Sequence, residues 1–187
     1  MSRVDMITNE RVFDDRHHMH EFQEFWRDSA VALAFLPQFG SVFGLAQARE
    51  LTANHDKICA LGARIVLIGI GTSIQGFTFR QRARSREPVM VTKDASLYRT
   101  MGLGRAARTY QGLQNLTTFA SLVHQGVYPF QRTGDPLRLG GIFVVPKGGA
   151  HVSWEHRPRF AADLASGEQL VTALERAIVD SATAPSS

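Results

Sequence analysis

The one cysteine of the chain, Cys59, limits the thiol chemistry that its own residues can perform. A single thiol excludes an internal disulfide, a CxxC redox pair and a cysteine-rich zinc site. Cys59 follows Ile58 near the apolar stripe of an expected helix, which predicts a buried structural thiol. A redox role would need an activating environment, and the nearby His55 and Lys57 give only a faint hint of one.

Ser41 is the second residue whose type and place could do chemistry. As a hydrolytic nucleophile at a helix start it would need a base, for which His124, His151 and His156 are candidates. The surrounding residues lack the G-x-S-x-G elbow that exposes such a nucleophile. The simpler interpretation is that Ser41 caps the following helix with its hydroxyl oxygen.

A histidine-rich run at His17, His18, Met19 and His20 raises the question of a metal site. Imidazole and thioether groups are ligands of copper and zinc. Neighbouring side chains on a helix point about 100° apart, so at most two of the four could converge on one ion. We therefore expect no metal site. The glycine pairs at 69/71 and 140/141 also lack the dinucleotide-binding spacing, and we expect no cofactor.

Charge and hydropathy restrict the partners. The chain of 187 residues has 21 basic and 17 acidic residues, a net charge of +4 that is weak evidence for nucleic-acid binding. The densest basic stretch, at residues 80–86, is typical of a solvated helix end; a site for an acidic ligand is the alternative. No apolar run approaches the roughly 18 residues of a membrane span, and the N-terminus has no signal-peptide pattern. We expect a cytoplasmic protein that binds neither nucleic acid nor membrane.

The elements that position these residues alternate between strand and helix. Continuous apolar runs predict strands buried on both faces at 31–36, 63–70 and 89–92, and an antiparallel hairpin at 142–146 and 152–156. Helical spacing predicts helices over 20–29, 45–61, 72–84, 116–123 and 169–179, with a short helix after Asp94. The order is βαβαβ, then an inserted segment at about 105–135, then ββα.

Four segments in this order resemble one known family. They are FLPQFGSVFGLAQARELTA (35–53), IGIGT (68–72), KDASLYRTMGLGR (93–105) and GDPLRLGGIFVVPKGG (134–149). The chain resembles the peroxiredoxin-like branch of the AhpC/TSA (alkyl-hydroperoxide-reductase/thiol-specific-antioxidant) proteins from Val31 to Ala177. The resemblance implies an α/β, thioredoxin-like fold with a mixed central sheet flanked by helices. The expected domains are an N-terminal helical extension (1–30), a thioredoxin-like domain (31–181) and a disordered tail (182–187).

The resemblance also identifies a degenerate active site. In the family a Phe-Gly-Cys-x-x-Cys turn opens the first long helix, where the helix dipole lowers the thiol pKa. Here Ser41 and Gly44 stand at the two cysteine positions, and an alcohol cannot form a sulfenic acid. This implies that thiol-redox chemistry is lost and that the turn lines a small-molecule pocket. Ser41 is the candidate catalytic residue, and the expected ligand-binding residues are Phe39, Gly40, Phe43, Gly44, Thr72, Phe77, Tyr110, Gly140 and Gly141.

Three functions follow from these observations. The favoured one is a pocket for a small-molecule ligand or substrate, in an enzyme that needs no cofactor and serves a biosynthetic pathway. The bias for arginine over lysine and the abundance of alanine indicate a bacterial source. The alternatives are an antioxidant thiol oxidoreductase acting through Cys59, and a non-catalytic interaction protein that forms a homodimer. The apolar segment 105–135, which includes Tyr110 and Phe119, is expected to cover the Ser41 pocket as a lid or to form a subunit interface.

Overall fold

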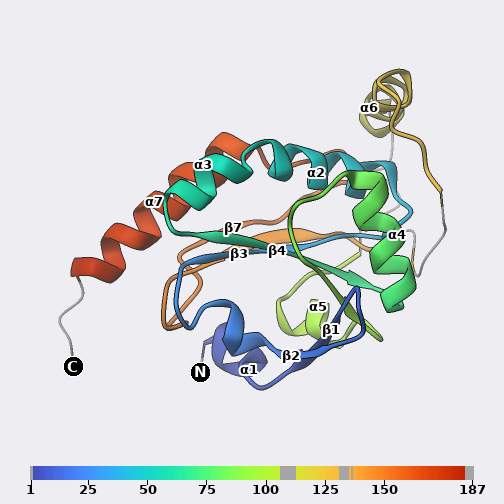
Figure 1. Cartoon of the computed structure of the whole chain (residues 1–187). Coiled ribbons are helices and arrows are strands. Elements are labelled where there is room, and N and C mark those ends of the chain that lie inside the picture. Colours follow the sequence, from blue (N-terminus) through green and yellow to red (C-terminus); the bar gives the residue numbers. More distant parts are fainter. Residues whose placement is uncertain (1, 106–112, 131–134, 136, 184–187) are drawn as a thin grey trace.

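The computed structural model describes residues 2–105, 113–130, 135 and 137–183 (Figure 1). One seven-stranded sheet runs through it in the order β2-β1-β5-β4-β3-β6-β7. The strands are β1 (Arg11–Asp14), β2 (Met19–Glu21), β3 (Val31–Phe35), β4 (Arg64–Ile70), β5 (Val89–Thr92), β6 (Gly141–Val145) and β7 (Trp154–His156). Strands β3, β4 and β5 are parallel neighbours, and the other pairs are antiparallel. The predicted mixed sheet is confirmed.

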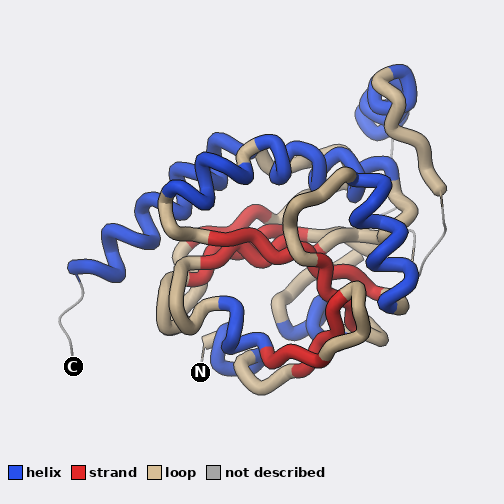
Figure 2. Tube along the Cα trace, in the orientation of Figure 1, coloured by secondary structure: helices blue, strands red, loops and turns tan. Residues whose placement is uncertain are grey.

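Helices cover both faces of this sheet (Figure 2). They are α1 (Arg3–Ile7), a 3-10 helix η1 (Phe22–Phe25), α2 (Val42–Ala53), α3 (His55–Ala60), α4 (Ser73–Ala83), α5 (Ser96–Thr100), α6 (Leu113–His124) and α7 (Gly167–Thr183). Helices α2, α3, α4 and α7 pack on one face, and α1, η1 and α5 lie on the other. Among the described helices none is long and apolar enough to cross a membrane.

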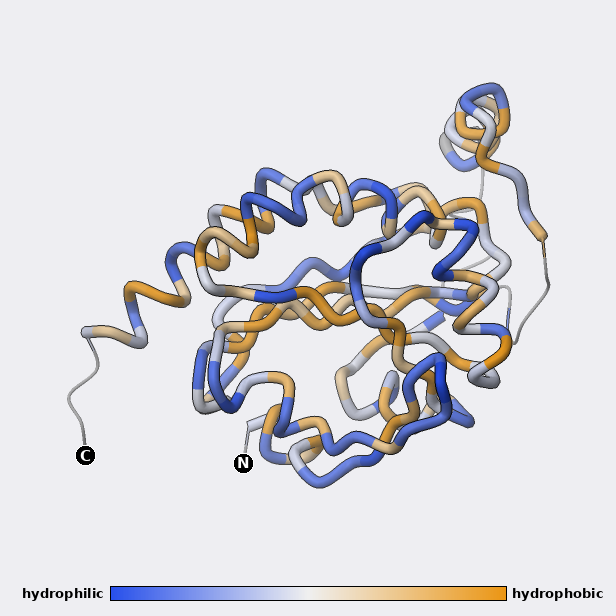
Figure 3. The backbone as a smooth tube through the Cα atoms, viewed as in Figure 1, coloured by the Kyte–Doolittle hydropathy of each residue, from blue (hydrophilic) through white to orange (hydrophobic). Residues whose placement is uncertain are grey.

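Two hydrophobic cores explain why the central strands are mostly apolar (Figure 3). Side chains alternate between the faces of a strand, and in β3 Ala32 and Ala34 enter the core under α2 and α7. Val31, Leu33 and Phe35 enter the core on the opposite face, beside α1 and α5. Because both faces are buried, no position of β3 favours a polar side chain.

The predicted helix over 20–29 is wrong, and the expected helical extension over residues 1–30 also contains two strands. Residues Phe22–Phe25 form only a short 3-10 helix. The rings of Phe22 and Phe25 lie 5.6 Å apart in the core that α1 and α5 cover. Strands β1 and β2 precede them as a hairpin, and β1 pairs with β5 through Phe13 and Val91. One turn suffices to bury the aromatic residues, while β5 gains a partner for its free edge. The domain boundary at residue 30 stays a prediction.

The predicted long helix over 45–61 is interrupted at Asn54, which separates α2 from α3. The Asn54 amide donates a hydrogen bond to the Glu50 carbonyl at 3.0 Å, and its backbone leaves the helical region. The predicted stop at Gly62 is confirmed, because this residue has φ +72°, where a Cβ would be strained. The path from Ser41 to Cys59 is therefore two helices rather than one.

The remaining predicted elements are confirmed with small changes of boundary. Strand β5 has the expected bounds, and α4 begins with a capping box between Thr72 and Gln75. Strands β6 and β7 form the expected hairpin. Helix α7 continues to Thr183, so the tail expected from residue 182 starts too early; residues 184–187 lie outside the described part.

Candidate functional site

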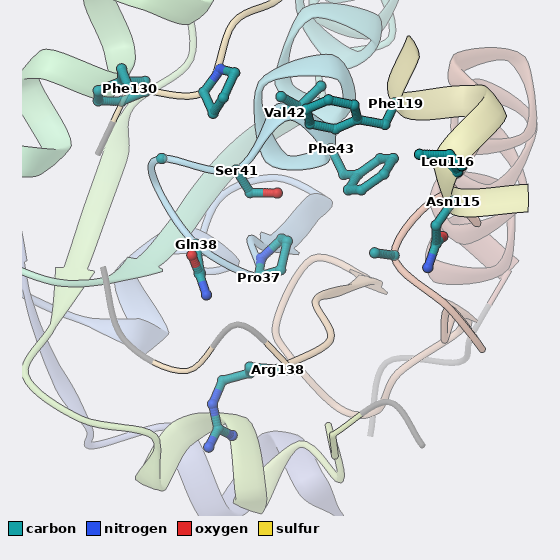
Figure 4. A pocket seen from close by; sticks show the side chains of 13 residues that line it. Pro37, Gln38, Ser41, Val42, Phe43, Asn115, Leu116, Phe119, Phe130 and Arg138 are labelled. Carbon is teal, nitrogen blue, oxygen red and sulfur yellow. The ribbon is translucent and has the colours of Figure 1, made fainter. Parts of the chain in front are cut away.

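A cavity of about 610 Å³ opens at the start of α2 (Figure 4). It lies beyond the carboxyl end of β3, where ligand sites of open α/β sheets are commonly found. The lining is mostly apolar, with Gln38, Ser41 and Asn115 as uncharged polar residues. The lining residues are Pro37, Gln38, Gly40, Ser41, Val42, Phe43, Asn115, Leu116, Phe119, Pro129, Phe130, Arg138 and Ala161.

Ser41 reaches the cavity because it is the N-cap of α2. Its φ and ψ of −74° and 135° are extended, and its Oγ accepts a hydrogen bond from the Gly44 N–H at 3.5 Å. The predicted capping role is confirmed. A Cβ at Gly44 would lie 2.7 Å from the Gln38 carbonyl oxygen, so the turn leaves no room for a side chain there. Gly44 thus shapes the turn.

Of the predicted site residues, Gly40, Ser41 and Phe43 line the cavity. Gly140 and Gly141 line an adjoining space of about 30 Å³, which shares Phe43 with the main cavity. This proximity follows from the sheet, since Gly141 of β6 pairs with the last residue of β3. The structure therefore brings five of the predicted residues to one end of the sheet.

Besides Gly44, three predicted residues in the described part of the chain do not line the cavity. Phe39 is fully buried behind it, with its ring 5.3 Å from that of Phe79. Thr72 caps α4, and Phe77 lies half-exposed on the same helix. Tyr110 lies outside the described residues. Thr72 and Phe77 lie at and near the start of α4, but neither is among the residues that line this cavity, so it gives their predicted ligand contacts no support.

Helix α6 and the segment after it supply a second wall. Leu116 and Phe119 come from one side of α6, and Phe130 follows the helix. The side-chain amide oxygen of Asn115 accepts a hydrogen bond from the Ala162 N–H at 3.1 Å, which ties α6 to a loop near the end of the sheet. Sequence reasoning missed Asn115, because nothing in its neighbourhood indicates a partner 47 residues away.

Arg138 lines the cavity, but its guanidinium does not face Ser41. In Figure 4 the side chain extends away from Ser41 toward α5. Its Cζ lies 5.9 Å from the centre of the Tyr98 ring, and one Nη is 3.8 Å from Asp135. The positive charge of Arg138 therefore acts beside the cavity, and sequence reasoning did not single out this residue.

The polar groups suit an oxygen atom of a ligand better than hydrolytic catalysis. Among the described residues no histidine is within hydrogen-bonding distance of Ser41, and His156 in the adjoining space is engaged by Asp163. The first N–H groups of α2 have no acceptor within the helix and give this end a partial positive charge. Ser41 and this helix end can donate hydrogen bonds to a carbonyl or carboxylate. In the described part of the chain no three potential ligands gather to hold a metal ion.

Cys59 lies away from this cavity, near the end of α3. The predicted burial of its thiol is wrong, because Cys59 is exposed. The next residue back, Ile58, is 1% exposed and carries the apolar contact of α3. A step of one residue turns a helix by about 100°, which moves the Cys59 side chain out of the core.

The comparison with known proteins decides the family. A family model described as AhpC/TSA antioxidant enzyme matches residues 50–159. The chain belongs to this AhpC/TSA family. The match and the fold confirm the resemblance drawn from the sequence.

Relatives of this AhpC/TSA chain include two fish proteins. A prostamide/prostaglandin F synthase of Salmo salar is 30% identical over 140 residues, which cover 71% of this chain and 68% of the relative. The protein of the same name from Danio rerio is 27% identical, with coverages of 83% and 79%. The bacterioferritin comigratory protein of Xanthomonas campestris has a similar fold, with a TM-score of 0.67 at 11% identity and coverages of 92% and 94%.

Proposed function

We propose that this peroxiredoxin-like protein uses the cavity at the start of α2 to bind a small, mostly apolar molecule. The ligand carries an oxygen function at one end, and thiol-redox chemistry does not take place at this cavity. The observation that carries the proposal is the cavity of about 610 Å³, lined by aromatic and aliphatic side chains around Ser41. The protein acts in the cytoplasm.

The cysteine content of the chain supports the loss of redox chemistry at this cavity. Ser41 stands where the family carries its first cysteine, and an alcohol does not form the sulfenic acid that peroxide reduction requires. Cys59, the one thiol of the chain, lies in α3 and is not among the lining residues. A peroxide bound beside Ser41 would therefore meet no thiolate of this chain.

The chemistry proposed for the cavity is stabilisation of negative charge on oxygen. The Ser41 hydroxyl and the first N–H groups of α2 lie together at one end, and such donors favour an enolate-like or alkoxide-like oxygen. Proton transfer or ring closure of a carbonyl compound would use this stabilisation without a cofactor. We place such a reaction in a bacterial biosynthetic pathway.

Helix α6 serves as the lid in this proposal. Leu116 is 65% and Phe119 38% exposed, although both line the cavity. A ligand between α2 and α6 would remove these apolar side chains from water, which favours binding. The fish relatives support the ligand class, because their name states a prostamide or prostaglandin product.

A second candidate function is a thiol oxidoreductase acting through Cys59 with an external thiol. The exposure of Cys59 favours it, since a buried thiol could not meet a substrate. A third is a dimeric interaction protein in which the apolar side of α6 meets a second copy of the chain.

Ligand binding is the direct test of the first function. Straight-chain fatty acids and the matching primary alcohols serve as probes, with affinity measured by calorimetry and by the rise in Tm. We expect binding to the wild type, weakened about tenfold by Phe43→Ala or Phe119→Ala, since each removes a large apolar contact. Ser41→Ala should weaken the acids more than the alcohols.

The matched control is Ile74→Ala. Ile74 is 79% exposed on α4 and does not line the cavity, so its removal should leave affinity unchanged. Light scattering completes the design. If no probe binds and Phe119→Ala dissociates a dimer, the subunit-interface function replaces the pocket.

A further inference from the structure

The exposed thiol of Cys59 contacts His55, and His55 in turn contacts Glu87. The His55 Nε2 lies 3.4 Å from the Cys59 Sγ, one helical turn away on α3. On its other side the His55 Nδ1 lies 2.6 Å from the Glu87 Oε1. Nucleophile, base and orienting carboxylate thus follow one another, which is the arrangement that activates catalytic thiols.

The exposures of the three groups fit these roles. Cys59 is exposed, the His55 side chain is 19% exposed and that of Glu87 4%. The sulfur can therefore meet a reagent from solvent, while the carboxylate is held inside. Burial raises the pKa of Glu87, and the hydrogen bond from His55 opposes that rise.

Glu87 selects one tautomer of the imidazole. An ionised carboxylate only accepts hydrogen bonds, so the proton of neutral His55 lies on Nδ1, facing Glu87. The lone pair of Nε2 then faces Sγ and can accept the thiol proton. Proton transfer gives a thiolate beside an imidazolium that Glu87 stabilises.

The surrounding chain fixes the glutamate in place. The Ser85 Oγ accepts a hydrogen bond from the Glu87 N–H at 3.0 Å and also one from the Thr52 hydroxyl of α2 at 3.4 Å. Other charges nearby are Asp56 and Lys57 on α3 and the guanidinium of Arg86, which pairs with Asp56 at 2.8 Å. Arg80 and Arg86 both act on the Glu87 carboxylate.

We propose that Cys59, His55 and Glu87 form a reactive thiol site that undergoes exchange with low-molecular-weight disulfides. The thiolate attacks one sulfur of the reagent RSSR, the reagent S–S bond breaks, and a Cys59–S–SR bond forms. The leaving thiolate takes the proton held by His55, so one thiol and one disulfide give one mixed disulfide and one RSH.

The product persists because the chain has no second cysteine to displace RSH from it. Only an external thiol restores Cys59, so the site records the ratio of disulfide to thiol around the protein. Ser41 and Cys59 lie at the two ends of the α2–α3 segment, and the exchange needs nothing from the cavity. This proposal deepens the second candidate function, which also acts through Cys59, and its failure would leave the cavity proposal intact.

The test is the rate of mixed-disulfide formation with dithiobis(nitrobenzoate), followed by the released thiol, and with oxidised glutathione, followed by intact mass. We expect the folded wild type to react about tenfold faster per thiol than the urea-unfolded chain, because only the folded chain holds the His55 Nε2 3.4 Å from Sγ, where it can accept the thiol proton. His55→Gln should abolish this advantage. Glu87→Gln keeps a hydrogen-bond acceptor but no charge and should lose about threefold.

Two readouts separate activation from a structural effect. His55→Gln should keep the far-UV circular dichroism of the wild type while it loses the rate, so that the loss reports activation of the thiol and not unfolding. Lys93→Gln is the control, since it removes a positive charge from an exposed lysine just after β5 and should leave the rate near that of the wild type. If Glu87→Gln does not fold, His55→Gln decides the matter. Equal rates for folded wild type and His55→Gln, or for wild type and unfolded chain, overturn the proposal.

Discussion

Replacing Tyr98 by phenylalanine removes one buried hydroxyl group near the carboxyl ends of β3 and β4. The Tyr98 hydroxyl donates to the Leu36 carbonyl at 2.6 Å and lies 3.1 Å from the Ile68 carbonyl. The residue is 0% exposed, and its ring packs edge-on against Phe35 at 5.1 Å. Tyr98→Phe keeps that packing and deletes only the hydrogen bond.

The expected loss in the free energy of unfolding depends on which backbone carbonyl loses its hydrogen-bond donor. The Ile68 carbonyl keeps a hydrogen bond from the Leu36 N–H at 2.7 Å. The Leu36 carbonyl loses its donor in a place that water does not reach, which costs about 1–3 kcal/mol. For a chain of this size each kcal/mol lowers Tm by about 2–4 °C. Burial raises the pKa of Tyr98, so the phenol remains a donor throughout the neutral range.

Urea unfolding followed by circular dichroism measures this difference. The free energy of unfolding should fall by about 1–3 kcal/mol, with the slope against urea unchanged. Tyr128→Phe is the matched control, because Tyr128 is 59% exposed and the same change there should stay within about 0.5 kcal/mol. A cost for Tyr98→Phe no larger than that of Tyr128→Phe would refute the reasoning.

Two further predictions concern the start of α2 and the end of β7. Ser41→Cys in a Cys59→Ser background should have a thiol whose pKa is below about 8.5, because the first turn of α2 favours the thiolate anion. The rate of thiol alkylation, measured against pH, gives this pKa. An ordinary pKa would contradict the alignment of the Ser41 turn with the family's cysteine turn. The Arg157 guanidinium, 2.8 Å from Glu155, holds the pKa of that carboxyl below its usual range. Glu155→Gln should therefore lower the free energy of unfolding by up to about 1 kcal/mol at neutral pH. Urea unfolding of the wild type and the variant should show that this difference disappears as the pH falls below about 4, where the carboxylate becomes protonated. A difference that stays constant with pH would contradict the ion pair.

The sequence by itself determined the central elements and the turn at Ser41. Strands β3, β4, β5 and β6 are apolar except at Arg64, which begins β4, and Thr92, which ends β5. Both faces of these strands are buried, and this pattern is local. The start of α2 at Ser41 and the end of α3 before Gly62 likewise rest on capping chemistry within a few residues.

The tertiary structure alone decided which distant residues meet. Asn115 bonds to Ala162, and Phe119 lines the same cavity as Ser41, because of where α6 lies in the fold. Residue spacing along the chain does not predict this position of α6. The exposure of Cys59 depends on how α3 packs in the fold. The contact between His55 of α3 and Glu87, which lies 32 residues later in the loop before β5, depends on the same packing. Local patterns record which face of an element is apolar, but contacts between elements are set by the packing of all of them at once.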